Sequence, residues 1–195
     1  MSRTGTVSRD TKETKIHVAV DLDGTGKVDV ATGVPFFDHM LDQLGRHGRL
    51  DLTVQAQGDL HIDEHHTVED VGIALGQALA EAWGDRSGLE RFGDAQVPID
   101  EALTRVAIDL SGRPYLVWEV DPPVLTIGTL EVHLLKHFFE AVVANARLTL
   151  HVHNVSGDNT HHVFESVFKA VAVALRRAVA STGGGGVPST KGVLQ

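Results

Sequence analysis

The chain has 195 residues, of which 42% are hydrophobic and 22% charged, so it can bury a core as one domain or two small ones. It contains no cysteine, which excludes disulfides, thiolate zinc sites, iron–sulfur clusters and a cysteine nucleophile. Its net charge of −9 disfavours nucleic-acid binding, and 12 histidines beside 7 Phe, 2 Trp and 1 Tyr indicate metal or acid–base chemistry.

The cellular location follows from what the sequence lacks. No apolar run approaches the roughly 18 residues that a membrane span needs. The first residues, Met1 to Gly5, lack the apolar stretch of a signal peptide. We therefore expect a cytoplasmic protein.

Along the chain, the hydrophobic pattern alternates between strand and helix periods. Period-two alternation predicts strands at 16–22, 50–54 and 148–152. Apolar residues at three-to-four spacing predict helices that include 68–79 and 164–175, and two further helices are expected at 36–44 and 134–142. Glycine-containing turns separate them at 23–26 and 111–114. The order strand, strand, helix, strand, helix in each half predicts an α+β fold.

The two halves of the chain are copies of one unit. Residues 36–52 align without a gap with residues 134–150, an offset of 98 that places His39 opposite His137. Residues 17–22 likewise resemble 105–110. The sequence therefore predicts one domain over 1–195, a tandem duplication of a sheet-plus-two-helices unit with repeats at about 10–92 and 93–182. Gly183 to Gly186 predict a hinge, and residues 183–195 a flexible lid.

A His-His-x-x-Glu motif occurs once in each repeat. Residues four apart share a helix face, so His65 with Glu69, and His161 with Glu165, can each offer a nitrogen and a carboxylate to one metal ion. A lone histidine on an apolar helix is more often a core residue than a ligand. Packing does not require imidazole at the same register twice, however, so we interpret the repeated histidines as ligands.

The ligands divide between two ions, each with positions left open for catalysis. The symmetric solution assigns to the first ion His65, Glu69, His162 and His137. It assigns to the second ion His161, Glu165, His66 and His39. Histidines without a repeated partner are expected to be strand-face or surface residues, namely His17, His61, His133, His151 and His153, and the role of His47 stays open.

Anion-binding side chains gather in the second half. Ser189, Thr190 and Lys191 supply donors and a positive charge for a phosphate, and Arg91 and Arg113 are candidate bidentate clamps. Lys169 follows Glu165 by four residues. It is either the ion-pair partner of that carboxylate or a phosphate ligand.

Several stretches together resemble the imidazoleglycerol-phosphate dehydratase family over nearly the whole chain. The stretches are Arg9–Thr14, Gly33–Met40, Asp63–Asp70, Arg91–Gly93, Asp109–Pro114 and Pro188–Gly192. The resemblance implies a duplicated fold like the second domain of ribosomal protein S5, two Mn²⁺ ions per active site, and 24 subunits with sites shared between neighbours. Ile99 and the stretch 151–156 depart mildly from the family pattern.

The resemblance also implies roles for individual residues. It makes Glu13 the acid–base residue and places Gln43 and Asp100 near the substrate. It assigns phosphate contacts to Arg91, Arg113, Lys169, Ser189 and Lys191, in addition to the Thr190 donor named above. The metal-centre residues counted as catalytic are His39, His65, Glu69 and Glu165.

The implied reaction is dehydration of D-erythro-imidazoleglycerol phosphate to imidazole acetol phosphate in histidine biosynthesis. Two metal ions, one at each ring nitrogen, would stabilise the imidazolate that this elimination needs. The alternatives are a dimetal hydrolase, which needs a metal-bound water aimed at an ester or phosphoryl group, and a non-enzymatic metal-binding module.

Overall fold

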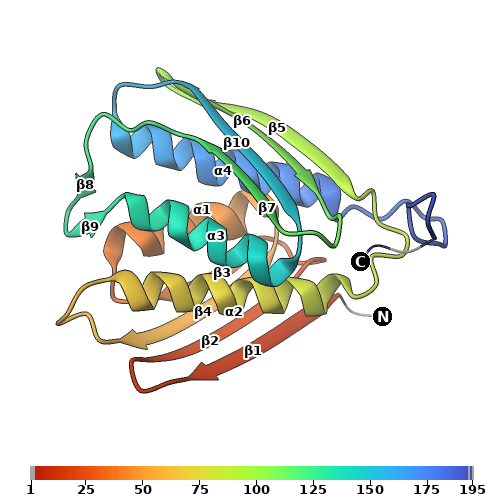
Figure 1. Cartoon of the computed structure of the whole chain (residues 1–195), viewed down its shortest axis with the longest axis horizontal. Coiled ribbons are helices and arrows are strands. Elements are labelled where there is room, and N and C mark those ends of the chain that lie inside the picture. Colours follow the sequence, from red (N-terminus) through yellow and green to blue (C-terminus); the bar gives the residue numbers. More distant parts are fainter. Residues whose placement is uncertain (1–2, 193, 195) are drawn as a thin grey trace.

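The computed structural model describes residues 3–192 and 194 of the chain. Two four-stranded sheets form its outer layers and four long helices lie between them (Figure 1). The first half contains β1 (Thr4–Asp10), β2 (Thr14–Asp21), β3 (Val28–Ala31), α1 (Pro35–Gly48), β4 (Asp51–Gly58) and α2 (His65–Trp83). The second contains β5 (Phe92–Ile99), β6 (Ala102–Asp109), β7 (Tyr115–Glu119), the short β8 (Thr126–Ile127) and β9 (Leu130–Glu131), α3 (His133–Ala146), β10 (Thr149–Ser156) and α4 (Thr160–Ala178).

The two sheets have the same topology. Their strand orders are β1-β2-β4-β3 and β5-β6-β10-β7, and in each the last pair is parallel while the others are antiparallel. This repetition confirms the α+β fold and its duplication. The prediction placed two strands before the first helix of each half, whereas three strands precede α1 and five, counting the short β8 and β9, precede α3. The short β3 and β7 lie at sheet edges and bury no side chain fully, so they lack a clear alternating pattern.

The helices pair across the two repeats. In the middle layer α1 packs on α4, and α2 packs on α3. Phe37 of α1 meets Phe138 of α3 edge to face at 5.2 Å between ring centroids, and Phe138 stacks on Phe168 of α4. Glycines bring α2 close to α3, since a Cβ at Gly72 would lie 2.8 Å from the carbonyl oxygen of Phe138. The apolar core therefore joins both repeats into one unit.

The start of β1 and the C-terminal segment lie at the same end of the molecule (Figure 1). The first strand begins at Thr4, ahead of the expected repeat start near residue 10, and its counterpart β5 begins at Phe92. In the segment predicted as a lid, the Gly186 carbonyl accepts a hydrogen bond from the Gly88 N–H at 3.0 Å. Residues 193 and 195 of that segment lie outside the described residues, as do residues 1 and 2 of the predicted domain. Among the described residues, no helix is long and apolar enough to cross a membrane.

Candidate active site

The first group of metal-ligating side chains lies where α1 packs on α4. His39 comes from α1, and His161 and Glu165 come from the first two turns of α4. Glu165 Oε2 is 3.2 Å from His161 Nε2 and 3.6 Å from His39 Nε2. One potential ligand atom of each residue lies within 4.8 Å of the other two. We call this group the α1–α4 trio.

The second group is its counterpart where α2 packs on α3. Glu69 Oε2 lies 3.8 Å from His65 Nε2, and Glu69 Oε1 lies 3.4 Å from His137 Nε2. Glu140 accepts a hydrogen bond from His137 Nδ1 at 3.3 Å, which turns His137 Nε2 toward Glu69. We call His65, Glu69 and His137 the α2–α3 trio. Cross-repeat helix packing thus unites, in each trio, residues that the sequence analysis assigned to one ion.

The donor atoms of these trios suit a divalent metal ion. Each trio offers two imidazole nitrogens and a carboxylate, a ligand set that binds divalent first-row metals. His137 Nε2 is buried and has no hydrogen-bond partner among the described residues. A buried polar atom without a partner is costly unless a ligand satisfies it. The residues present therefore fit a metal ion at this position.

His66 and His162 lie outside both trios. His66 Nδ1 donates a hydrogen bond to Asp59 at 3.0 Å and lies 3.9 Å from Glu13, and His162 Nδ1 donates to Glu101 at 2.8 Å. These bonds raise the pKa of both imidazoles, lower that of Asp59, and lower the pKa of Glu101 to about 2. The predicted assignment of His162 and His66 as fourth ligands stays a prediction.

Lys169 lies next to the α1–α4 trio. Its ammonium is 2.6 Å from Glu165 Oε1, so it forms the i,i+4 ion pair that the sequence left as one of two options. Burial opposes ionisation of Glu165, but Lys169 and His39 outweigh it and hold the pKa of this carboxyl below its usual value. Glu165 is therefore kept ionised, as a metal ligand must be. The predicted phosphate contact of Lys169 stays a prediction.

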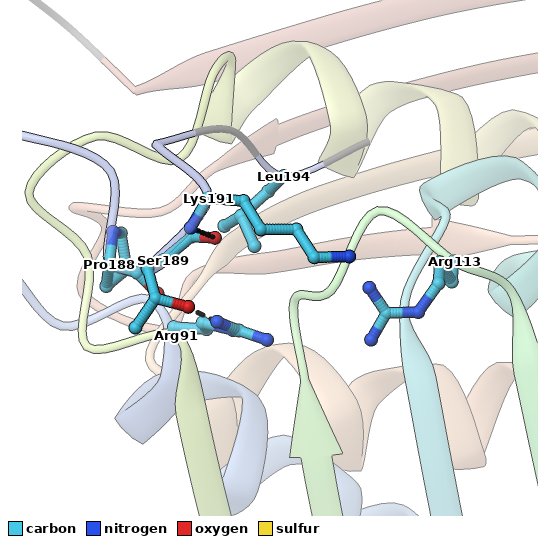
Figure 2. Close-up of a pocket in the computed structure, with 7 residues that line it drawn as sticks. Arg91, Arg113, Pro188, Ser189, Lys191 and Leu194 are labelled. Carbon is cyan, nitrogen blue, oxygen red and sulfur yellow. Dashed lines mark hydrogen bonds between the residues drawn. The ribbon is translucent and has the colours of Figure 1, made fainter.

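A basic pocket of about 890 Å³ lies beneath the C-terminal segment. Figure 2 shows the side chains of Arg91, Lys191 and Arg113 extending toward a common space. The pocket is lined by Arg91, Arg113, Pro188, Ser189, Thr190, Lys191 and Leu194, with no acidic residue among them. The structure thus brings together five of the predicted phosphate-binding residues.

Arg91 is the most firmly held of the three cations. Its guanidinium donates to both carboxylate oxygens of Asp109, at 2.7 and 3.1 Å, and to the Pro188 carbonyl at 2.8 Å. Three of its five N–H groups are thus engaged, and two are left for an anion. The bond to Pro188 holds the C-terminal segment against the pocket (Figure 2).

The pocket and the α1–α4 trio lie at opposite ends of α4. His161 is in the first turn of α4, while the Arg91 N–H bonds the carbonyl of Ala178, its last residue. Ala178 follows His161 by 17 positions, which correspond to about 25 Å of helix at about 1.5 Å per residue. In Figure 1, α4 runs from the end with β8 and β9 to the end with the C-terminal segment. The trio and pocket of one chain cannot touch the same small molecule.

The remaining predicted site residues lie on separate elements. Glu13 is at the β1–β2 turn, with an exposed carboxyl group. Asp100 is at the β5–β6 turn with a φ of +46°, a conformation that few non-glycine residues adopt. Gln43 is buried in α1, where its Oε1 lies 3.2 Å from His47 Nε2.

Sequence reasoning missed two carboxylates, Asp59 and Glu101. Both bind the Nδ1 atom of a predicted metal ligand. A signal for Glu101 was present, because the offset of 88 that relates residues 17–22 to 105–110 also relates Glu13 to Glu101. No comparable pattern marks Asp59, which follows a strand and is seven residues from its histidine.

Comparison with known proteins gives the chemistry of this site. A family profile described as imidazoleglycerol-phosphate dehydratase matches residues 32–175, a range that contains both trios. The chain belongs to the imidazoleglycerol-phosphate dehydratase family. It is accordingly a hydro-lyase of histidine biosynthesis, as the resemblance implied.

Relatives and solved structures agree with this assignment. The imidazoleglycerol-phosphate dehydratases of Frankia casuarinae and Parafrankia sp. are 59% and 58% identical to the chain, each over 100% of both sequences. The crystal structure of the Staphylococcus aureus imidazoleglycerol-phosphate dehydratase has a TM-score of 0.83 at 38% identity, covering 92% of this chain and 99% of its own. That of Pyrococcus furiosus, in complex with (S)-C348, has a TM-score of 0.83 at 37% identity, covering 96% and 100%.

Proposed function

We propose that this chain dehydrates D-erythro-imidazoleglycerol phosphate to imidazole acetol phosphate with two Mn²⁺ ions per active site, in the cytoplasm. The observation that supports a metal requirement is the pair of repeat-related trios. In each trio, two imidazoles and one carboxylate place their potential ligand atoms within 4.8 Å of one another. When bound, the two ions would supply Lewis-acid stabilisation of negative charge on the imidazole ring of the substrate.

We further propose that each active site is shared between subunits of a homo-oligomer. The support is the distance of about 25 Å along α4 between the trio at its start and the basic pocket at its end. A small phosphorylated imidazole cannot span it, so the trio of one chain must meet the pocket of another. His66 and His162 would then supply the fourth ligands across such interfaces. The number of subunits expected from the family is 24.

The chain's own residues divide the chemical work. Arg91, Arg113 and Lys191 bind the phosphate and so fix the glycerol side chain, because charge-assisted donors around one space hold an anion in place. The elimination removes the hydroxyl group from the carbon attached to the ring and a proton from the next carbon. Glu13 has an exposed carboxyl group at the β1–β2 turn, and we assign to it the proton transfer. The enol so formed becomes the ketone of the product.

The β1–β2 turn that carries Glu13 is held to α2. Asp70 of α2 accepts hydrogen bonds from Arg9 and from Thr14, the residues that flank this turn. Asp70 and Thr14 are buried, so their contact is shielded from water. Glu13 is therefore anchored near His66 while its own carboxyl group stays accessible to substrate.

The decisive experiment uses purified protein stripped of metal. With imidazoleglycerol phosphate as substrate, formation of imidazole acetol phosphate is followed spectroscopically with and without added Mn²⁺. We expect turnover only with the metal. Equal turnover in a chelator and in Mn²⁺ would refute the metal requirement, and absence of turnover with either would refute the assigned reaction. A dimetal hydrolase would instead release alcohol or phosphate from an ester, and a binding module would turn over neither compound.

A further inference from the structure

The two histidines outside the trios each use one ring nitrogen in the same way. A carboxylate only accepts hydrogen bonds, so the Nδ1 atoms that face Asp59 and Glu101 must carry the proton. Nδ1 is therefore closed to a metal ion. No described residue hydrogen-bonds or pairs with the Nε2 atom of His66 or His162. In both side chains, Nε2 is the nitrogen left for a ligand.

Glu101 is itself fixed by its surroundings. Its Oε1 accepts the backbone N–H of Asn159 at 3.0 Å while its Oε2 accepts Nδ1 of His162. Asn159 in turn caps α4, since its side chain accepts the N–H of His161 at 2.9 Å. The carbonyl of Glu101 also accepts a hydrogen bond from Ser156 Oγ. The carboxylate therefore links the β5–β6 turn to the start of α4 and aims the imidazole of His162.

The two repeats carry equivalent carboxylates but use different ones. The pairings Asp10 with Lys15 and Pro98 with Leu103 place both hairpins in one register, offset by 88 residues, so Glu101 is the counterpart of Glu13. In the second repeat Glu101 lies 2.8 Å from His162 and accepts its hydrogen bond. In the first repeat Glu13 lies 3.9 Å from His66, and Asp59 accepts the hydrogen bond of that histidine instead.

The counterpart of Asp59 is also present and unused. Gly58 packs against Thr67 of α2, and Gly157 packs against Val163 at the equivalent place on α4. Asp158 follows Gly157 as Asp59 follows Gly58. Three residues separate Gly157 from His161, compared with six between Gly58 and His65, and the carboxylate of Asp158 forms no hydrogen bond or ion pair with a described residue.

We propose that Glu101 and Asp59 are positioning residues that hold His162 and His66 in the Nδ1–H tautomer, with Nε2 presented to a metal ion, and that Asp59 thereby frees Glu13 for proton transfer. The inference rests on the proposed two-metal function. In this division of labour, one member of each repeat-related pair of carboxylates orients an imidazole. In the first repeat the spare member is Glu13 at the hairpin turn, and in the second repeat it is Asp158, which follows β10.

The test measures metal binding rather than activity. Protein stripped of metal is titrated with Mn²⁺ against a competing chelator for the wild type, Glu101→Ala, Glu101→Gln and Asp59→Asn. Loss of an orienting partner typically weakens metal binding about 10- to 100-fold. We expect Glu101→Ala to weaken one of the two binding events by this factor while both ions still bind at saturation. Glu101→Gln should weaken it less, since an amide oxygen still accepts Nδ1–H, and Asp59→Asn should weaken the other event.

A matched control is available at the far edge of the second sheet. Glu119 accepts a hydrogen bond from His153 Nδ1 at 2.7 Å, a contact as short as that of Glu101, but neither residue is near a trio in sequence or belongs to one. Glu119→Gln should leave both binding events unchanged. A merely structural role for Glu101 would disturb the start of α4 and weaken both ions, because His161 and Glu165 are on the same helix.

Three outcomes would overturn the inference. Wild-type affinity in Glu101→Ala would show that the hydrogen bond does not matter, and loss of one ion even at saturating Mn²⁺ would make Glu101 a direct ligand. Equal weakening of both events would make it a structural residue. If Glu101→Ala does not fold by circular dichroism, Glu101→Gln decides in its place. His162→Ala separates this inference from the proposed function, because unchanged binding in that variant would remove His162 from the metal centre altogether.

Discussion

Two inactive variants of this chain should restore activity to each other when they assemble together. One carries His39→Ala, which removes a ligand from the α1–α4 trio. The other carries Arg113→Ala with Lys191→Ala, which removes two of the three cations of the basic pocket. Because about 25 Å of α4 separates trio from pocket, an intact site in a mixed assembly takes its trio from the second variant and its pocket from the first.

The size of the recovery follows from this geometry. In a random mixture of equal amounts, half of the α1–α4 trios and half of the basic pockets are intact. Because each site takes its trio and its pocket from different chains, about a quarter of the sites of a closed assembly have both. Each parent should be nearly inactive. Mutation of a residue that hydrogen-bonds to a metal ligand typically lowers metal affinity or activity by roughly 10- to 100-fold, and loss of the ligand His39 itself should lower them more. Two lost charge-assisted contacts of about 1.5–3 kcal/mol each lower kcat/KM by about 100-fold or more.

The assay co-expresses the variants with different affinity tags and purifies through both, so that every assembly measured is mixed. We expect kcat/KM near a quarter of the wild-type value per site. The control pairs His39→Ala with His161→Ala, whose lesions fall in the same trio, so no intact site can form. Mixed assemblies no more active than their parents would refute the shared site, and a single chain would then have to hold trio and pocket around one substrate.

Further predictions concern the metals, the C-terminal segment and pH. His39→Ala and His137→Ala should each retain about one ion per subunit after stripping and reloading, and full occupancy by metal analysis in either would contradict the trios. Lys191→Ala should lower kcat/KM about ten- to hundred-fold with both metals bound. Truncation after Gly186 should lower kcat/KM further, and near wild-type kinetics of the truncated chain would contradict a role for the C-terminal segment. In metal-free protein, Glu101→Gln should lower the unfolding temperature most between pH 4.5 and 6.5. The lowered pKa of Glu101 gives stability that is lost as the pH falls toward about 2, and the raised pKa of His162 gives stability that is lost as the pH rises through it. A difference in unfolding temperature that does not vary with pH would contradict the ion pair.

Much of the site was readable from the sequence because its signals are local. The i,i+4 spacing of His65 with Glu69, and of His161 with Glu165, places each pair on one helix face in any fold that keeps the helix. Duplication made the other histidines interpretable, since a chance histidine does not recur at the same register. The spacing of apolar residues likewise predicted α2, α4 and the strands β2, β4 and β10, each of which buries one face.

Tertiary structure decided what depends on contacts between distant segments. Cross-repeat packing of α1 on α4 and of α2 on α3 is what brings His39 to Glu165 and His137 to Glu69. It also leaves His66 and His162 facing carboxylates instead of the trios. Local pattern cannot fix which helix faces pack together, because several pairings would bury the same apolar stripes.

The sequence by itself determined the residue types of the site and the two-fold repetition that organises them. Only the folded chain placed the α1–α4 trio and the basic pocket at opposite ends of α4, and only it brought Glu101 within 2.8 Å of His162 while leaving Glu13 at 3.9 Å from His66. The physical reason is the range of the interactions involved, because the periods of helices and strands are set by residues that are neighbours along the chain. Distances across the fold are set by how whole elements pack, which no single segment encodes.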